Sequence, residues 1–356
     1  MIALTLGAFL TLGVGGLLLA QSRSVALEYA VSDVQQRGRF ALARLREDLH
    51  RAGFAGCSTG IGTPMALQSG ADSVASAVQR SAVRAYSRTA KGTWEDTDAS
   101  DADLAWTRVL RSERQRGARY GSQVLHLRIG YALHSADGVP RLIERPVPAG
   151  ADRVFISDNP ECAVKQHHRV ALADCSGSVH AFQVSNPISC NSSRNSNPAL
   201  LKMGVSAQMQ AFSASYDVDA EVIVVDDVVW FVGESGIDSS SNPPSNGDAR
   251  PVWALYRDSR NDRRGPQEVV AGVEYLRLGL VSGRTPSAVD AVEVSLLLAS
   301  MNEVLDAEDQ NQYVLNDTRV VPPGVTTPPG IQHGGGRKLR QVATRTVLLR
   351  NAGGAW

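Results

Sequence analysis

The sequence predicts an α+β fold in which one long N-terminal helix packs on an antiparallel β-sheet with long loops. Apolar residues recur at spacings of three and four along residues 27–52, as on one face of a helix. β-rich runs bounded by turn-forming residues recur along the chain beyond residue 120, separated by loops. The 356 residues can bury a large core, and 36 Lys+Arg balance 36 Asp+Glu, so net charge gives no reason to expect nucleic-acid binding.

Residues 1–20 contain no charged side chain. At about 1.5 Å per residue, a helix of this length spans the roughly 30 Å hydrocarbon core of a bilayer. We therefore expect residues 1–20 to be the transmembrane half of the helix; a cleaved signal peptide is the alternative, but no basic region precedes the apolar run. Small residues permit close approach of neighbouring helices, and on this ground we predict a helix assembly face at Gly7, Gly13, Gly16 and Ala20.

Residues 21–53 are predicted to be the amphipathic, extramembrane half of the same helix. At about 100° per residue, eight small or apolar positions fall within a strip roughly 80° wide. These positions are Leu27, Val31, Val34, Gly38, Ala41, Leu45, Leu49 and Ala52. We expect Val31, Val34, Ala41, Leu45 and Leu49 to face the protein's own sheet, and Gly53 and Gly56 to end the helix. Tyr29 and Phe40 point away from the strip, which fits either exposure to solvent or contact with a neighbouring subunit.

Residues 54–356 are predicted to form one globular β-rich domain. Nine runs have strand character: 122–133, 152–157, 179–184, 211–218, 222–232, 252–257, 273–281, 289–299 and 341–350. Three turn-rich stretches, 186–198, 234–251 and 322–336, are interpreted as surface excursions on the sheet because strand signals resume on either side.

The run QQRGRFALARLREDLHRAGFAGC, residues 35–57, resembles the start of PilW-type minor pilins of type IV pili. Segments at 173–184, 255–276, 292–298 and 344–351 also resemble that family. The resemblance implies a pilin-like fold without enzymatic activity or cofactors, and a role near the pilus tip in initiating pilus assembly, in twitching motility and in adhesion. Prepilins also carry a basic leader and a Phe-Thr-Leu-x-Glu-Leu start that are not present here, so we expect the natural start to lie upstream.

The resemblance further implies partners and a location. The partners would be other minor and major pilins, the pilus assembly platform, a tip adhesin and the membrane, with no nucleic acid. The protein would reside in the inner membrane with a periplasmic domain, and on the pilus after assembly. Two other functions stay open: a minor pseudopilin of a type II secretion system, and a signal-anchored periplasmic binding protein or enzyme.

The four cysteines, Cys57, Cys162, Cys175 and Cys190, are an even number, which in an oxidising compartment indicates up to two disulfides with three connectivities. The resemblance singles out the motifs around Cys57 and Cys175, and so implies a Cys57–Cys175 bond, with Cys162–Cys190 as the second. A metal site built from Cys162, His167, His168 and Cys175 is the alternative, but zinc sites do not commonly use this spacing.

Motifs for catalysis are not found. Gly233-Glu234-Ser235-Gly236 lacks the full nucleophile elbow, and no phosphate-binding loop occurs. The acidic pairs Asp226-Asp227 and Asp217/Asp219 lack the spaced ligands of a calcium loop, so we expect them at solvated strand ends. The sequence therefore predicts no catalytic, cofactor-binding or metal-binding residues.

Overall fold

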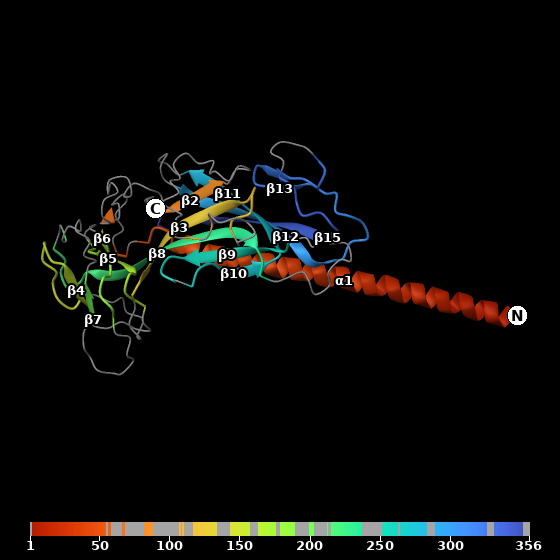
Figure 1. The fold of residues 1–356 in the computed structure, drawn as a ribbon, viewed down its shortest axis with the longest axis horizontal. Helices are drawn as coiled ribbons and strands as arrows, with labels where there is room; N and C mark the ends of the chain where they lie inside the picture. Colours follow the sequence, from red (N-terminus) through yellow and green to blue (C-terminus); the bar gives the residue numbers. More distant parts are fainter. Residues whose placement is uncertain are drawn as a thin grey trace.

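The regular structure consists, in the described residues, of one helix and fifteen strands (Figure 1). This computed structural model describes residues 2–54, 56–57, 66–67, 82–87, 107, 109, 117–133, 143–156, 163–175, 179–188, 199–202, 212, 215–236, 251–262, 264–282, 289–325 and 331–351.

Helix α1 runs without interruption from Ile2 to Arg51. Figure 1 shows its carboxyl-terminal half lying along the β-rich body, while its amino-terminal half projects away from it. The helix stops because Gly53 adopts a positive φ of 72° and donates its N–H to the carbonyl of Arg128 at 2.9 Å. The Asn351 side chain donates to the carbonyls of His50 and Ala52, so the end of the chain satisfies helix-terminal acceptors.

The largest sheet has eight strands, and the valine-rich β8, Glu221–Glu234, runs through its centre. The order β1-β6-β5-β8-β3-β2 describes most of it, with β9 and β10 continuing beside the carboxyl-terminal part of β8. Pairing is antiparallel except between β1 and β6. The other members are β1 (Ala66–Leu67), β2 (Val83–Ser87), β3 (Gln123–Ala132), β5 (Arg169–Ala173), β6 (Val179–Gln183), β9 (Trp253–Ser259) and β10 (Gln267–Ala271).

Three smaller sheets complete the described strands. Antiparallel β11, β12 and β15 form a three-stranded sheet, and β13–β14 and β4–β7 form two-stranded ones. Their bounds are β4 (Arg153–Ile156), β7 (Ala199–Lys202), β11 (Val273–Ser282), β12 (Val289–Glu303), β13 (Tyr313–Leu315), β14 (Thr318–Val320) and β15 (Lys338–Leu348).

The main core lies where α1 meets the eight-stranded sheet and the β11–β12–β15 sheet. Val34, Ala41, Leu45 and Leu49 of α1 are buried there, as the periodicity predicts, while Val31 is only partly buried. Gly38 allows the close approach, because a Cβ at this position would lie 3.3 Å from both Ala343 and Leu298. The carboxyl-terminal half of the helix is thus held by two sheets.

The predicted pilin-like α+β fold class is wrong. Of the residues that the structure describes in full, 47% lie in strands, so this part of the chain is mostly β-structure and is not a long helix laid on one antiparallel sheet. Four of its five hydrophobic clusters contain no residue of α1. The physical reason is in the connections: stretches 186–198 and 322–336, interpreted as excursions on one sheet, join strands that belong to different sheets.

The predicted membrane anchor is also not supported. Across the part of α1 whose side chains are described, no stretch is both long and apolar enough to cross a membrane. The expectation that α1 spans a membrane with residues 1–20, and the inner-membrane location that depends on it, are therefore not supported.

Shortening Leu45 to alanine is expected to lower the free energy of unfolding by about 3 kcal/mol, because its fully buried side chain would leave a cavity between helix and sheets. Urea denaturation of the full chain measures the change. The matched control is Arg46→Ala on the exposed side of the same turn, which should change stability by less than about 0.5 kcal/mol. Equal stability of the Leu45 variant and the wild type would contradict this packing.

Candidate functional site

Helix α1 carries a line of exposed apolar side chains, most of them on its projecting part, which we name the outer stripe. Its members are Val14, Leu18, Val25, Tyr29 and Phe40. The exposed fraction is 61% for Leu18 and 74% for Tyr29, unusually high for large apolar residues. Several large apolar side chains exposed along one helix are typical of a surface that meets another molecule.

The spacing shows that the outer stripe is one face of the helix. Successive members are separated by 4, 7, 4 and 11 residues, each close to a whole number of turns at 3.6 residues per turn. At about 100° per residue they fall within a strip about 80° wide, on the side opposite Val34 and Leu45. The outer stripe therefore faces away from the body of the protein, and spans about 39 Å at 1.5 Å per residue.

The residues of the predicted helix assembly face do not all lie on the same side of α1. Gly13, Gly16 and Ala20 lie on the side of α1 that continues toward the body-packing residues, and Gly7 lies two turns before Val14 on the line of the outer stripe. A Cβ at Gly7, Gly13 or Gly16 would have no atom within 4 Å, so this chain leaves space around each of them. The small residues thus offer two opposite helix faces instead of one.

A buried ion pair fastens α1 to the eight-stranded sheet. Asp48, on the body-facing side of the helix, accepts hydrogen bonds from Arg257 Nε at 2.8 Å and from Trp230 Nε1 at 2.9 Å. Burial lowers the pKa of Arg257, but its bonds and charge contact with Asp48 outweigh this and raise it. Sequence reasoning missed these partners, although an aspartate among the apolar positions of the helix was a usable signal. The contact holds the carboxyl-terminal end of α1 on the sheet.

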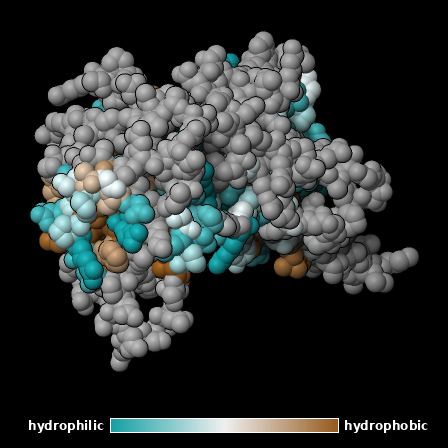
Figure 2. All heavy atoms as spheres, turned by 60° about the vertical axis from the view of Figure 1, so that its left-hand side comes forward, coloured by the Kyte–Doolittle hydropathy of each residue, from teal (hydrophilic) through white to brown (hydrophobic). Residues whose placement is uncertain are grey.

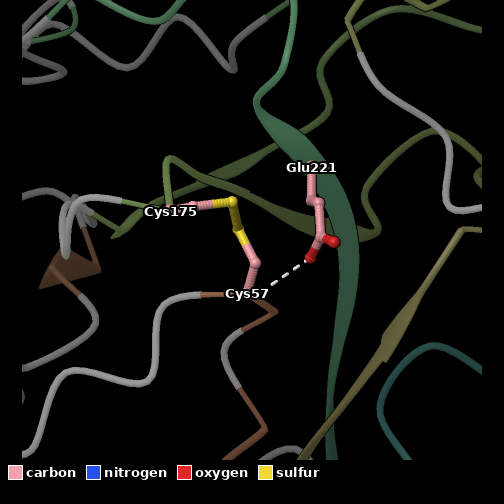
Figure 3. The surroundings of a disulfide bond; sticks show 3 residues. All are labelled: Cys57, Cys175 and Glu221. Atoms are coloured by element: carbon pink, nitrogen blue, oxygen red, sulfur yellow. Dashed lines mark hydrogen bonds between the residues drawn. A yellow bond between two sulfur atoms is a disulfide. The ribbon is translucent and has the colours of Figure 1, made fainter.

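The end of the helix is fastened a second time by a disulfide between Cys57 and Cys175 (Figure 3). The backbone N–H of Cys57 also donates to Glu221 at 2.7 Å, at the start of β8. This is the pairing that the resemblance implied. The expected Cys162–Cys190 bond lies outside the described residues.

The alternative metal site is not compatible with this arrangement. Cys175 is engaged with Cys57, and a disulfide sulfur is not a thiolate ligand. His167 and His168 are described and Cys162 is not, and no cluster of three metal-ligating side chains occurs within the described ranges.

The acidic pair Asp226-Asp227 is not at a solvated strand end, which corrects that expectation. Both carboxylates are buried in the middle of β8, and they point to opposite faces of the sheet. Burial raises the pKa of Asp226 to about 6, while bonds from Ser259 and the Asn261 N–H oppose the rise. Alternation alone could not place these residues, because β8 is buried on both faces and reads as a nearly continuous apolar run.

The opposite end of the molecule has a different character. Figure 2 turns the side that carries β4–β7 in Figure 1 toward the viewer, and its coloured surface mixes hydrophilic residues with smaller hydrophobic areas. The outer stripe of α1 is the docking surface that we consider below.

Comparison with known proteins adds no relative: no family model, no curated protein and no solved structure matches the chain.

Proposed function

We propose that this protein is a minor subunit of a type IV pilus and takes part in initiating pilus assembly near the tip. The observation that carries the proposal is the outer stripe: an exposed apolar face on a helix that projects beyond the body. Other minor and major pilins are the partners, and their N-terminal helices are the elements that the stripe would contact.

A second long helix is the occupant that fits this surface best. The outer stripe is narrow and straight, so it matches the side-chain ridge of another helix better than a globular surface. Burying its five side chains would remove several hundred Å² of apolar surface from water at about 25 cal/mol per Å². Gly7, on the line of the outer stripe, would let the partner helix approach closely.

Two further observations support the proposal. The run at residues 35–57, which resembles PilW-type minor pilins, spans the part of α1 that packs on the body and ends at Cys57. The disulfide at Cys57 would form in an oxidising compartment, and pilus subunits are exported into such a compartment. A minor pseudopilin of a type II secretion system would use the same surface, and neighbouring genes for other minor pilins or for secretion components distinguish the two.

The test is to place charge on the outer stripe. In a strain that lacks the gene, the Val25→Glu/Tyr29→Glu variant should restore less than about a tenth of wild-type piliation and twitching, because carboxylates would be buried against an apolar helix. Isolated, it should keep the melting temperature of the wild type, since both positions are exposed in the single chain.

The matched control is Ser24→Glu/Gln35→Glu, which adds the same charge at exposed polar positions of α1 outside the outer stripe. It should restore piliation nearly as well as the wild type. Full piliation by the stripe variant would overturn the proposed docking surface, and normal piliation of the deletion strain itself would overturn the proposed function.

A further inference from the structure

A cluster of basic side chains surrounds Asp227 on the face of the eight-stranded sheet opposite α1. Three arginines from different strands share this one carboxylate: Arg128 of β3, Arg169 at the start of β5 and Arg260 just after β9. Register explains the convergence, because β5 and β9 both pair with β8 and leave Asp227 between the start of one and the end of the other. Arg128 lies directly across from Asp227 on β3.

Positive charge exceeds negative charge in this cluster. Three guanidinium groups against one carboxylate leave a formal surplus of two charges. Burial lowers the pKa of Arg169, Asp227 opposes the change, and the neighbouring Arg260 and Arg128 lower it further. Arg84 and Asp258 face the same side of the sheet at the margin of the cluster, and their opposite charges cancel.

Within the part of the chain that the structure describes, many hydrogen-bond donors of these arginines are unused. Each guanidinium has five N–H donors, and each contacts Asp227 through a single nitrogen: Nε of Arg128 at 3.3 Å, Nη1 of Arg169, and Nη1 of Arg260 at 3.5 Å. The side chains are 16–39% exposed, so the remaining donors can reach solvent, while Asp227 beneath them is 4% exposed. The cluster is a donor-rich surface over a buried counter-ion.

A buried histidine beside the cluster also lacks a partner. Neither ring nitrogen of His126 makes a hydrogen bond within the described part of the chain. Its Nε2 lies 3.6 Å from Asp227 Oδ1, beyond hydrogen-bond distance, and its ring stacks on Tyr86. An unpaired polar group that is 8% exposed costs stability unless a ligand or water satisfies it.

We propose that Arg128, Arg169 and Arg260 form a binding site for an oxyanion of the phosphate or sulfate class, with Asp227 holding their guanidinium groups in place and His126 as a neighbouring donor. Arginine forks match tetrahedral oxyanions, and the surplus of two charges matches a dianion. The site is independent of the outer stripe, because it lies on the other side of the eight-stranded sheet from α1.

The experiment titrates the full chain in chloride buffer with inorganic phosphate, inorganic sulfate and phenyl phosphate, using calorimetry and the shift in melting temperature. We expect saturable binding of one oxyanion per chain. Arg260→Gln, which changes the most exposed of the three arginines, should raise Kd about tenfold, the effect of losing one charge-assisted contact. The matched control Arg264→Gln removes the same charge four residues away, at a side chain that is 83% exposed, and should leave Kd unchanged.

A second variant separates binding from folding. Asp227→Asn removes the counter-ion, so it should melt at a lower temperature than the wild type in chloride and gain more from phosphate than the wild type does. Binding of phenyl phosphate would identify an ester as the natural source of the oxyanion, and binding of the inorganic ions alone would identify a free anion. Absence of saturable binding of all three probes up to tens of millimolar, or equal loss in the Arg260 and Arg264 variants, would overturn the site.

Discussion

Replacing both Cys57 and Cys175 with alanine is expected to lower the free energy of unfolding by about 4–5 kcal/mol. The two residues are 118 positions apart, and the chain-entropy model gives this magnitude for a loop of that length. The bond joins the end of α1 to the β5–β6 connection, next to a hydrophobic cluster that contains no helix residue. Its loss should therefore release the β5–β6 region from the helix. It should also raise the conformational entropy of the unfolded chain, which lowers stability.

Urea denaturation of the double alanine variant measures the loss, and hydrogen exchange shows where it falls. We expect the melting temperature to drop by about 10 °C or more, and amides of β5 and β6 to exchange faster than those of β12. The double variant is preferable to reduction, because it changes only the Cys57–Cys175 bond. A drop of less than 1 °C would show that the bond does not link the two regions energetically.

Periodicity predicted the helix well because a helix is specified by local spacing. The strip from Val34 to Leu49 is buried as expected, and the glycine stop at Gly53 has the positive φ that ends a helix. Eight of the nine predicted strand runs contain a strand of the structure; the run at 211–218 is only partly described, with a single bridge from Tyr216 to Val147. Local pattern thus identified elements, including the long β8 and β12.

Assignment of strands to sheets could not be predicted in the same way. β12 pairs with β11 along one edge and with β15, far along the chain, along the other, and nothing in its apolar alternation distinguishes β15 from β9 as a partner. The short strands β5, β10 and β13 were missed because three to five residues carry too little pattern. Long-range pairing depends on side chains from distant segments, so the sequence led to one sheet where the structure has several.

For the candidate surfaces too, local spacing could be predicted from the sequence and long-range pairing could not. The outer stripe follows from helical spacing, and Tyr29 and Phe40 were already placed on the outer side by sequence alone. The arginine cluster did not follow, because Arg128, Arg169 and Arg260 are brought together by three different strand pairings around Asp227. An acidic pair in a valine-rich strand was the signal that these carboxylates need buried cationic partners.

A second buried network, centred on Arg340, should be as sensitive as the disulfide. The Arg340 side chain is fully buried and donates from Nε and Nη2 to Glu274, each at 3.0 Å, and from Nη1 to Asp309 at 3.0 Å. Burial raises the pKa of Glu274 and of Asp309, but hydrogen bonds, including those from Arg340, hold both pKa values below their ordinary range. This network ties β15 to β11 and to the segment before β13.

Arg340→Met is expected to cost about 3–5 kcal/mol at pH 7, because it leaves two buried carboxylates without their cation. Those carboxylates would then have raised pKa values in the folded state, so they would take up protons as the pH falls. The stability difference from the wild type should therefore be largest at pH 7 and shrink toward pH 5, as measured by urea denaturation at both values.

The control Arg337→Met breaks the exposed pair with Glu303, and should cost less than about 1 kcal/mol at either pH. If Arg340→Met does not fold at pH 7, adding Glu274→Leu and Asp309→Leu should restore folding by removing the unpaired charges. Equal losses in the two single variants, or a loss that grows toward pH 5, would contradict the role given to Arg340.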